Sequence, residues 1–179
     1  MGLRSVVQTE NCSAPRVSQR LKRVPTIIDK LRREPTMQLG NMQDIGGCRA
    51  VVADLDELRR VERRLKKNRP PVAVYDYVAS PRPSGYRSVH VVITYDDRLI
   101  EVQLRTQVMH SWAIAVERLG GRRSEDLKSG EGPQEVLDFF GAVSEAMAVE
   151  EAGETVDASL IKRIGVLRDR ADRFFRGDA

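Results

Sequence analysis

Two neighbouring stretches of the sequence carry side chains that can do chemistry, in alternation with apolar residues. They are SVHVVITY (88–95) and LIEVQL (99–104), the second followed by Arg105. Alternation predicts two strands with one buried face, and the DDR between them predicts a hairpin turn. The face opposite the apolar residues then gathers a hydroxyl, an imidazole, a carboxylate, an amide and a guanidinium, from Ser88, His90, Glu101, Gln103 and Arg105.

This polar set has two interpretations. Antiparallel strand pairs commonly have one solvated face, and the set could be no more than that. A solvated face, however, usually carries Lys, Thr and Ser, whereas this one combines an acid, a base and hydrogen-bonding groups within two short stretches. The inventory favours a site that handles phosphate groups and a metal ion.

Asp44 is the second carboxylate of interest, because it precedes Gly46 and Gly47 at the start of the predicted strand 48–53. Glycines there let the backbone approach a ligand or bend sharply. Asp44 and Glu101 could together hold Mg²⁺, which takes one or two carboxylates plus substrate phosphates. An isolated Asp more often caps a turn, and strict alternation would put Arg49 on the opposite face from Asp44, so both interpretations stay open.

The segment SPRPSG (80–85) has the composition of a loop, and it leads into Tyr86 and Arg87. A tyrosine between Gly and Arg is suited to stack its ring on a base or on a guanidinium. The alternative is a tyrosine that closes its own loop. Arg82 and Arg87 bring positive charge next to the start of the hairpin.

Motifs that are missing narrow the chemistry. The sequence has no GxxxxGK[ST] phosphate loop, no GxGxxG, no HExxH and no GxSxG. Its two histidines cannot build a metal centre made of several histidines. A nucleotide enzyme with this sequence must therefore hold phosphates with side chains and Mg²⁺.

The elements expected to position these residues alternate between helix and strand in mixed order. Residues 1–12 read as an unanchored start and 35–47 as a loop. The chain is expected to be of the α/β (α+β) class, a mixed β-sheet flanked by helices. The expected elements are a helix over 13–34 interrupted at Pro25, strands 48–53, 71–78, 88–95 and 99–104, and helices 54–67, 107–119, 133–151 and 155–175.

Composition bounds the class of protein. A chain of 179 residues suits one domain, or one domain with a small helical appendage. The net charge of +4 suits a polyanionic substrate, although an ordinary solvated surface explains it equally well. Cys12 and Cys48 have no metal-ligand spacing, which favours a reducing cytoplasm, and no apolar run is long enough to span a membrane.

Four segments, in order and with compatible spacing, resemble the motifs of RelA/SpoT-type synthetase domains. They are RLKRVPTIIDK, DIGGCR, YDYVASPRPSGYRSVH and IEVQLRTQVMHSWA, which run from about Arg20 to Trp112. The resemblance implies a nucleotidyltransferase-like synthetase fold with a C-terminal helical extension. It also implies transfer of the β,γ-pyrophosphate of ATP to the 3′-hydroxyl of GDP or GTP, which makes (p)ppGpp.

The resemblance implies roles position by position. Asp44 would bind Mg²⁺ with Glu101, and Glu101 would orient or deprotonate the 3′-hydroxyl. Arg49 would pack on adenine, and Tyr86 would stack on guanine. The other ATP-side positions are Arg20, Lys22, Thr26 and Lys30, and the other acceptor-side positions are Arg82, Arg87, His90, Gln103, Arg105 and His110.

The chain departs from the family pattern at a few positions. Thr26 stands where Ser is usual, Arg82 where Lys is usual, and His110 where Asn or Asp is more common. Val116 and Glu117 occupy the place of a usual Glu-His pair. Two alternatives therefore accompany the alarmone synthetase: a toxin-type pyrophosphokinase that acts on the 3′ end of tRNA or on adenosine nucleotides, and a non-catalytic homologue that binds nucleotides or RNA.

The expected organisation is a synthetase core over residues 1–120 and a C-terminal helical extension over 121–179. The sequence has no His-Asp dipeptide, so the hydrolase half of long family members is not expected. Apolar stripes in the extension favour core packing, with an oligomer interface as the alternative. ATP and GDP or GTP are the expected partners; tRNA, a second copy of the chain and an antitoxin stay open, and no membrane partner is expected.

Overall fold

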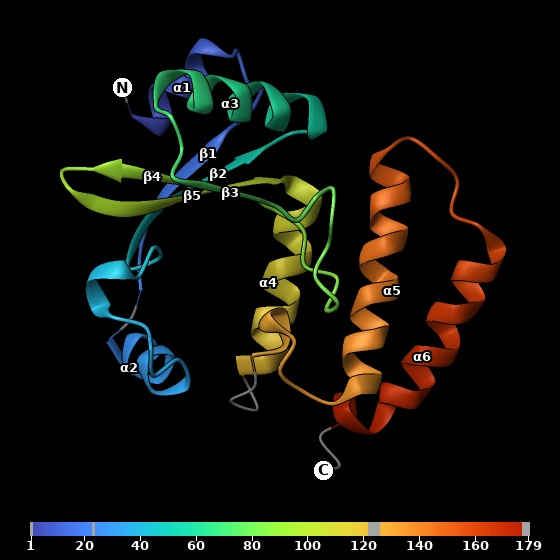
Figure 1. Cartoon of the computed structure of the whole chain (residues 1–179). Helices are drawn as coiled ribbons and strands as arrows, with labels where there is room; N and C mark the ends of the chain where they lie inside the picture. The colour runs from blue at the N-terminus through green and yellow to red at the C-terminus, as the bar shows by residue number, and fades with distance from the viewer. Residues whose placement is uncertain (1, 23, 122–125, 177–179) are drawn as a thin grey trace. The chain divides into compact units, whose positions relative to one another are not determined.

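A computed structural model describes residues 2–22, 24–121 and 126–176 of the chain (Figure 1). A mixed five-stranded sheet has the order β1-β2-β5-β4-β3, with β2 and β5 parallel and the other neighbours antiparallel. The predicted mixed sheet is confirmed. The strands are β1 (Arg16–Leu21), β2 (Gly46–Val52), β3 (Ala73–Asp76), β4 (Val89–Tyr95) and β5 (Arg98–Thr106).

The helices accompany the sheet in the order that the sequence predicts from residue 24 onward. Short 3₁₀ turns at Leu39–Asn41 and Leu127–Ser129 add to them. The α-helices are α1 (Leu3–Thr9), α2 (Val24–Arg33), α3 (Leu55–Asn68), α4 (Gln107–Gly121), α5 (Gln134–Glu151) and α6 (Ala158–Arg176). Within the described ranges, no helix is long and apolar enough to cross a membrane.

The chain divides into two compact units. The sheet unit consists of residues 1–76 and 88–106, and the helical unit consists of residues 77–87 and 107–179. The helical unit therefore contains α4 and the segment before β4 as well as the C-terminal helices. The division expected from sequence, at residue 120, stays a prediction.

One face of the sheet is apolar and is covered by α1 and α3 (Figure 1). Helix α3 begins at an N-cap, Asp54, whose side chain accepts a hydrogen bond from the amide of Glu57. Its buried residues Leu58, Val61 and Leu65 recur at helical spacing and remove one stripe of the helix from water. This layer leaves the polar side chains of the hairpin on the other face.

The N-terminal region differs from the sequence prediction in two places. Residues 16–21 form the edge strand β1 rather than the first part of a helix, because RVSQRL pairs its backbone along the open edge of β2. Residues 1–12 are not an unanchored start, since α1 buries Leu3, Val6 and Val7. The second helical piece, with Pro25 in the first turn of α2, is confirmed.

The helical unit has its own apolar core. Trp112 of α4 packs near Phe140 of α5, with the ring centroids 6.2 Å apart, and donates a hydrogen bond from Nε1 to the Phe140 carbonyl at 3.2 Å. Apolar residues of the C-terminal region contribute to this core, as expected for core packing, together with residues of α4 and of the segment before β4. Other buried members are Tyr86, Ala113, Val116, Leu127, Val136, Leu137, Ala171 and Phe174.

Gly47 is required by the close approach of β2 and β5. A Cβ atom at this position would lie 2.6 Å from the backbone carbonyl oxygen of Glu101, which the neighbouring strand cannot easily move. Gly47 lies opposite Glu101 in the parallel register. The absence of a side chain therefore lets the strand that carries Glu101 pair closely with β2.

Gly47→Ala should lower the free energy of unfolding by about 1–3 kcal/mol, because the added methyl group overpacks the β2–β5 pair. Urea denaturation of the variant and the wild type measures the difference. Gly40→Ala is the control, since a Cβ at Gly40 would meet nothing within 4 Å. Equal losses in both variants would show that the close strand approach is not the cause.

Candidate active site

The polar face of the sheet carries a continuous row of functional side chains from four strands. The pairing registers place Arg49 of β2 opposite Gln103 of β5, and Gln103 opposite His90 of β4. His90 in turn lies opposite Tyr75 of β3. Paired residues point to the same side of a sheet, so the predicted grouping of His90 and Gln103 on one face is confirmed.

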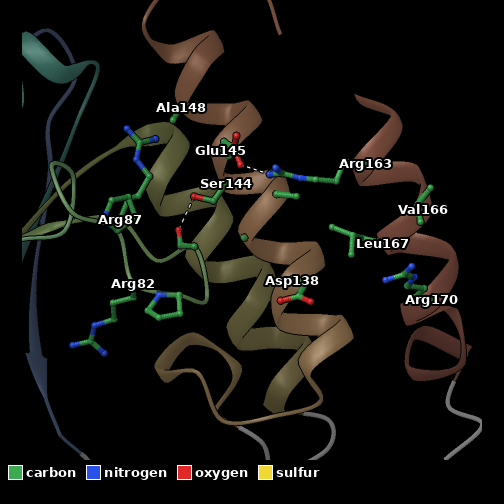
Figure 2. Close-up of a pocket in the computed structure, with 15 residues that line it drawn as sticks. Arg82, Arg87, Asp138, Ser144, Glu145, Ala148, Arg163, Val166, Leu167 and Arg170 are labelled. Atoms are coloured by element: carbon green, nitrogen blue, oxygen red, sulfur yellow. Dashed lines mark hydrogen bonds and ion pairs between the residues drawn. The ribbon is translucent and has the colours of Figure 1, made fainter. Parts of the chain in front are cut away.

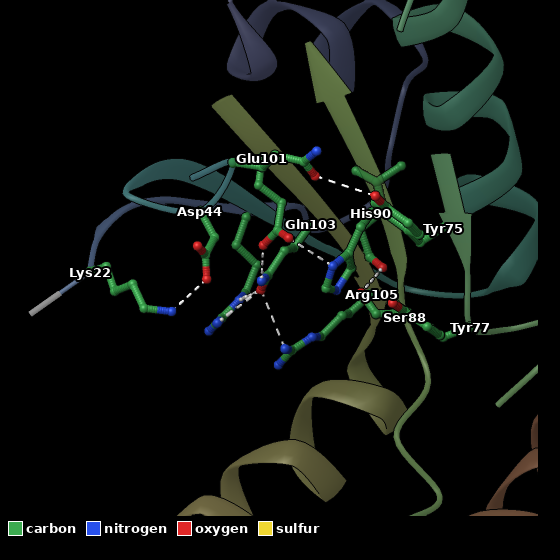
Figure 3. Close-up of polar contacts among 12 residues, drawn as sticks. Lys22, Asp44, Tyr75, Tyr77, Ser88, His90, Glu101, Gln103 and Arg105 are labelled. Atoms are coloured by element: carbon green, nitrogen blue, oxygen red, sulfur yellow. Dashed lines mark hydrogen bonds and ion pairs between the residues drawn. The ribbon is translucent and has the colours of Figure 1, made fainter. Parts of the chain in front are cut away.

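Glu101 lies at the centre of this face and accepts two hydrogen bonds (Figure 3). The Nδ1 atom of His90 lies 3.0 Å from Oε2 of Glu101, and Nε2 of Gln103 donates to Oε1 at 2.5 Å. The side chain of Glu101 is only 14% exposed. A carboxylate this enclosed needs donors of this kind to remain charged.

Burial alone would raise the pKa of Glu101, and the negative charge of Asp44 adds to that effect. The hydrogen bond and the electrostatic interaction with His90, together with the hydrogen bond from Gln103, outweigh both effects and leave the pKa below its ordinary value. Glu101 is therefore a carboxylate at neutral pH, ready to accept a hydrogen bond or a proton.

Gln103 links this carboxylate to two arginines. Its Oε1 accepts hydrogen bonds from Nη2 of Arg49 at 3.2 Å and from Nη2 of Arg105 at 3.3 Å, while its amide nitrogen serves Glu101. Arg105 is fully buried. The amide thus joins two positive groups and one negative group in a single hydrogen-bonded network.

Asp44 lies in the turn just before β2 rather than on the strand itself. Strict alternation along a strand therefore does not apply to Asp44. Arg49, which lies on β2, shares the face of Glu101. The carboxylate of Asp44 accepts hydrogen bonds from Nζ of Lys22 at 2.5 Å and from Nζ of Lys30 at 3.3 Å. Asp44 is thus part of a charged cluster and is not a simple turn cap.

The two ammonium groups control the charge of Asp44. Burial would raise its pKa, but the hydrogen bonds and charges of Lys22 and Lys30 overcome that effect and hold the pKa below its ordinary value. Lys22 itself is largely enclosed, with its side chain 9% exposed. A cluster of one carboxylate and two ammonium groups has spare positive charge for the phosphates of a nucleotide.

The carboxylates suit Mg²⁺ shared with phosphates better than a metal site built from protein ligands alone. Among the residues that the structure describes, no group of three or more His, Cys, Asp or Glu side chains is placed to hold a metal ion. Asp44 and Glu101 are close enough for the charge of Asp44 to affect the pKa of Glu101. Mg²⁺ commonly takes one or two carboxylates and completes its shell with phosphate oxygens and water, so this pair fits it.

The remaining ATP-side residues lie near the start of the chain. Arg20 of β1 lies opposite Gly47, which puts it on the same side of the sheet as Glu101. Thr26 is exposed in the first turn of α2, the helix that also supplies Lys30. Arg20 comes from β1, Lys22 follows the end of that strand and Lys30 comes from α2, and the assignment of all three to ATP stays a prediction.

The acceptor-side residues of the helical unit are held by contacts within that unit. The guanidinium of Arg82 lies over the ring of Tyr77, 4.5 Å from its centroid, and donates to the Tyr77 hydroxyl at 3.0 Å. Arg87 forms an ion pair with Glu151 at 3.1 Å, and His110 is half-buried on α4. Contacts of Arg82, Arg87 and His110 with an acceptor stay predictions.

Tyr86 is more enclosed than its loop-like sequence suggests. The residue is 2% exposed and belongs to the apolar core of the helical unit. Its ring is approached by the guanidinium of Arg82, 5.6 Å from the centroid, and by the ammonium of Lys128 at 5.7 Å. The ring thus has cationic neighbours of the kind that the sequence suggested, and stacking on guanine stays a prediction.

Sequence reasoning missed two polar residues. Tyr75 is 40% exposed beside His90, and its hydroxyl donates to Gln43 at 3.4 Å. Its place on the polar face follows from the alternation of β3, which could have identified it. Glu151, the partner of Arg87, ends a helix far along the chain, and no local motif marks it.

Replacing Lys22 with Met should raise the pKa of Asp44, because it removes the nearest ammonium while keeping an aliphatic chain of similar length. A carbon-detected NMR titration of the Asp44 carboxyl group measures this change. Lys67→Met, at an exposed position in α3, is the matched control and should leave the pKa of Asp44 unchanged.

The same variant should change how stability depends on pH. The folded-state pKa of Asp44 lies below its unfolded value, so the cluster stabilises the fold above the unfolded-state pKa. That contribution is lost as the pH falls through the folded-state pKa. Lys22→Met should therefore flatten the acid side of the unfolding free-energy curve, and a curve identical to that of the wild type would contradict the role of Lys22.

Comparison with known proteins gives relatives that include GTP pyrophosphokinases. GTP pyrophosphokinase YjbM of Bacillus subtilis (strain 168) is 32% identical over 140 residues, which cover 70% of this chain and 66% of YjbM. The chain thus spans slightly less than two thirds of that relative's length.

Solved structures agree with that relationship. The crystal structure of the small alarmone synthetase 1 from Bacillus subtilis has a TM-score of 0.70 at 30% identity, and the match covers 84% of this chain and 83% of the other. The structure of that synthetase bound to its product pppGpp also has a TM-score of 0.70 at 30% identity, and the match covers 85% of this chain and 83% of the other. The predicted synthetase-type fold is confirmed. A family model described as a region found in RelA / SpoT proteins matches residues 19–118, more than half of the sequence, and the chain therefore belongs to this family.

Proposed function

We propose that this protein transfers the β,γ-pyrophosphate of ATP to the 3′-hydroxyl of GDP or GTP, and so makes (p)ppGpp. The observation that carries the proposal is the ionised Glu101, enclosed by His90 and Gln103 on the same sheet face as Arg49. A hydroxyl group is a poor nucleophile until a base takes its proton, and Glu101 is the carboxylate available for that task.

In the proposed step, the 3′-oxygen of the acceptor attacks the β-phosphorus of ATP. The bond between that phosphorus and the oxygen bridging it to the α-phosphate breaks, and AMP leaves with the electron pair. The hydroxyl proton passes to Glu101. His90, at 3.0 Å, holds the carboxylate in one orientation, so its free lone pairs point to a defined place.

Catalysis of such a transfer is mostly positioning and charge stabilisation, because negative charge spreads over the phosphoryl oxygens. Lys22 and Lys30 are placed beside Asp44 to neutralise part of that charge. Mg²⁺, held by Asp44 and Glu101 with the nucleotide phosphates, would supply further charge neutralisation. In that state we expect the two ammonium groups to turn from Asp44 toward the phosphates.

The acceptor is the finer part of the proposal. YjbM is named a GTP pyrophosphokinase, and a similar solved structure is described as bound to its product pppGpp. These descriptions belong to those proteins, and they favour a guanosine nucleotide over tRNA or an adenosine nucleotide as the acceptor here. Purified protein with Mg²⁺ and ATP labelled at the γ-phosphate tests this when GDP, GTP, ATP and bulk tRNA are offered in turn.

Label on GDP or GTP supports the proposal. Label on tRNA alone would identify a toxin-type enzyme instead, and a labelled product in which ATP has gained pyrophosphate at its 3′-hydroxyl, with no label on the other acceptors, would identify an adenosine-nucleotide pyrophosphokinase. Transfer to none of the four would favour a non-catalytic homologue. The separated products distinguish all of these outcomes in one experiment.

Glu101→Gln should lower kcat by about 10²–10⁴-fold, the usual contribution of a general base, because the amide cannot accept the hydroxyl proton. The rate of labelled product formation with saturating GDP measures the loss. Glu34→Gln, which changes an exposed carboxylate after α2, should retain the wild-type rate. A Glu101→Gln enzyme with an unchanged kcat would remove Glu101 as the base.

A further inference from the structure

Residues 81–87, which we call the arginine loop, are attached to helix α5 by side chains. Oγ of Ser144 donates a hydrogen bond to the carbonyl oxygen of Gly85 at 2.5 Å (Figure 2). Nη1 of Arg87 forms an ion pair with Oε2 of Glu151 at 3.1 Å. The loop is thus attached at its middle and at its end, to two positions about two turns apart on one helix.

The ion pair between Arg87 and Glu151 is buried. The side chain of Arg87 is 8% exposed and that of Glu151 is 5% exposed. Glu151 is the last residue of α5, and Arg87 immediately precedes the segment that enters β4. Removing either partner would leave the other charge enclosed without its compensation, so the two side chains depend on each other.

Gly85 shows how closely the loop approaches the helix. Its φ of +87° lies in the left-handed region, and a Cβ atom there would lie 2.8 Å from both the Phe140 carbonyl oxygen and the Ser144 side chain. The turn that produces this approach has two backbone hydrogen bonds, from Gly85 to the Arg82 carbonyl at 2.8 Å and from Arg82 to the Tyr86 carbonyl at 3.2 Å. The loop therefore has one defined conformation against α5.

Packing does not enclose the loop on every side. A cavity of about 770 Å³ lies between the arginine loop, α5 and α6, and Pro83, Gly85 and Arg87 line it from the loop (Figure 2). Across the cavity, Arg163 of α6 pairs with Glu145 of α5, and both side chains are about half exposed. On the side of α5, the loop is held by the hydrogen bond from Ser144 and the ion pair with Glu151. The buried ring of Tyr86 and a hydrogen bond from Oγ of Ser84 to the Lys128 carbonyl at 2.9 Å hold the loop in addition.

We propose that Glu151 is a positioning residue for the nucleotide acceptor, which acts by fixing Arg87 and with it the arginine loop. The inference rests on the proposed function, because Arg82, Tyr86 and Arg87 of this loop are the expected acceptor-side residues. Glu151 is not one of the residues that we propose to accept the proton or to hold ATP. Its loss should therefore weaken use of the acceptor and leave the chemical step and the use of ATP unchanged.

Hydrogen exchange tests the structural half of the proposal without reference to activity. In Glu151→Gln, the loop amides of Arg82 and Gly85 should exchange at least about tenfold faster than in the wild type, since the buried charge pair is lost. Glu150→Gln, at the exposed neighbouring position, should leave these rates unchanged. Unchanged loop exchange in a folded Glu151→Gln protein would overturn the proposal.

Steady-state kinetics test the functional half. Glu151→Gln should raise KM for GDP or GTP by about tenfold while kcat and KM for ATP stay within about twofold, and Glu151→Asp, which keeps the charge, should recover part of the loss. Equal rises in KM for ATP and for the acceptor would indicate general damage and would overturn the positioning role.

The experiments also cover two further outcomes, namely a Glu151→Gln variant that does not fold and a wild type without transfer activity. If Glu151→Gln does not fold, Arg87→Lys replaces it in the exchange experiment, because Lys keeps the buried charge but lacks the planar guanidinium; faster loop exchange is again expected, and wild-type exchange would overturn the proposal. If the wild type transfers pyrophosphate to no acceptor, the proposed function fails, and the exchange rates alone decide whether Glu151 fixes the loop.

Discussion

Parallel pairing of β2 with β5 is the constraint on which the candidate site depends. It brings Gly47 against the backbone of Glu101 and sets Arg49 beside Gln103 in the same register. Asp44 falls in the turn just before β2 begins, where its charge reaches Glu101. Antiparallel pairing of β4 with β5 then adds His90 from the other side. A shift of β2 by one residue would move Arg49 to the opposite face and would disperse the group.

The candidate site also keeps charged groups ionised in an enclosed environment. Two carboxylates, Asp44 and Glu101, stay ionised although burial opposes it, because each is given its own donors. Asp44 has ammonium groups on flexible chains, which can turn toward a ligand. Glu101 has an imidazole and an amide on neighbouring strands, which hold it in one orientation. In the mechanism that we propose, the lysines beside Asp44 would neutralise phosphate charge and the fixed carboxylate of Glu101 would accept the proton.

Much of this arrangement could be predicted from the sequence, because alternation in 88–95 and 99–104 is a local signal for which side chains share a face. The edge strand 16–21 could not, since RVSQRL fits either a helix or a strand and its conformation is decided by the open edge of β2. The enclosed position of Tyr86 depends on helices much later in the chain. Glu151 is invisible in the same way, because its partner Arg87 is brought to it only by the packing of α5.

Gln103 limits which sequences this site could tolerate. Its amide oxygen accepts hydrogen bonds from two guanidinium groups, and its amide nitrogen donates one to a carboxylate. Gln103 therefore links groups of opposite charge. A carboxylate at position 103 would repel Glu101, and an ammonium group would repel Arg49 and Arg105. A hydrocarbon side chain would leave Glu101, Arg49 and Arg105 without this hydrogen-bond partner in an enclosed environment. Among ordinary side chains of this length, only a neutral group that both donates and accepts hydrogen bonds satisfies every neighbour. The range of residues tolerated at position 103 should therefore be far narrower than its lack of formal charge suggests.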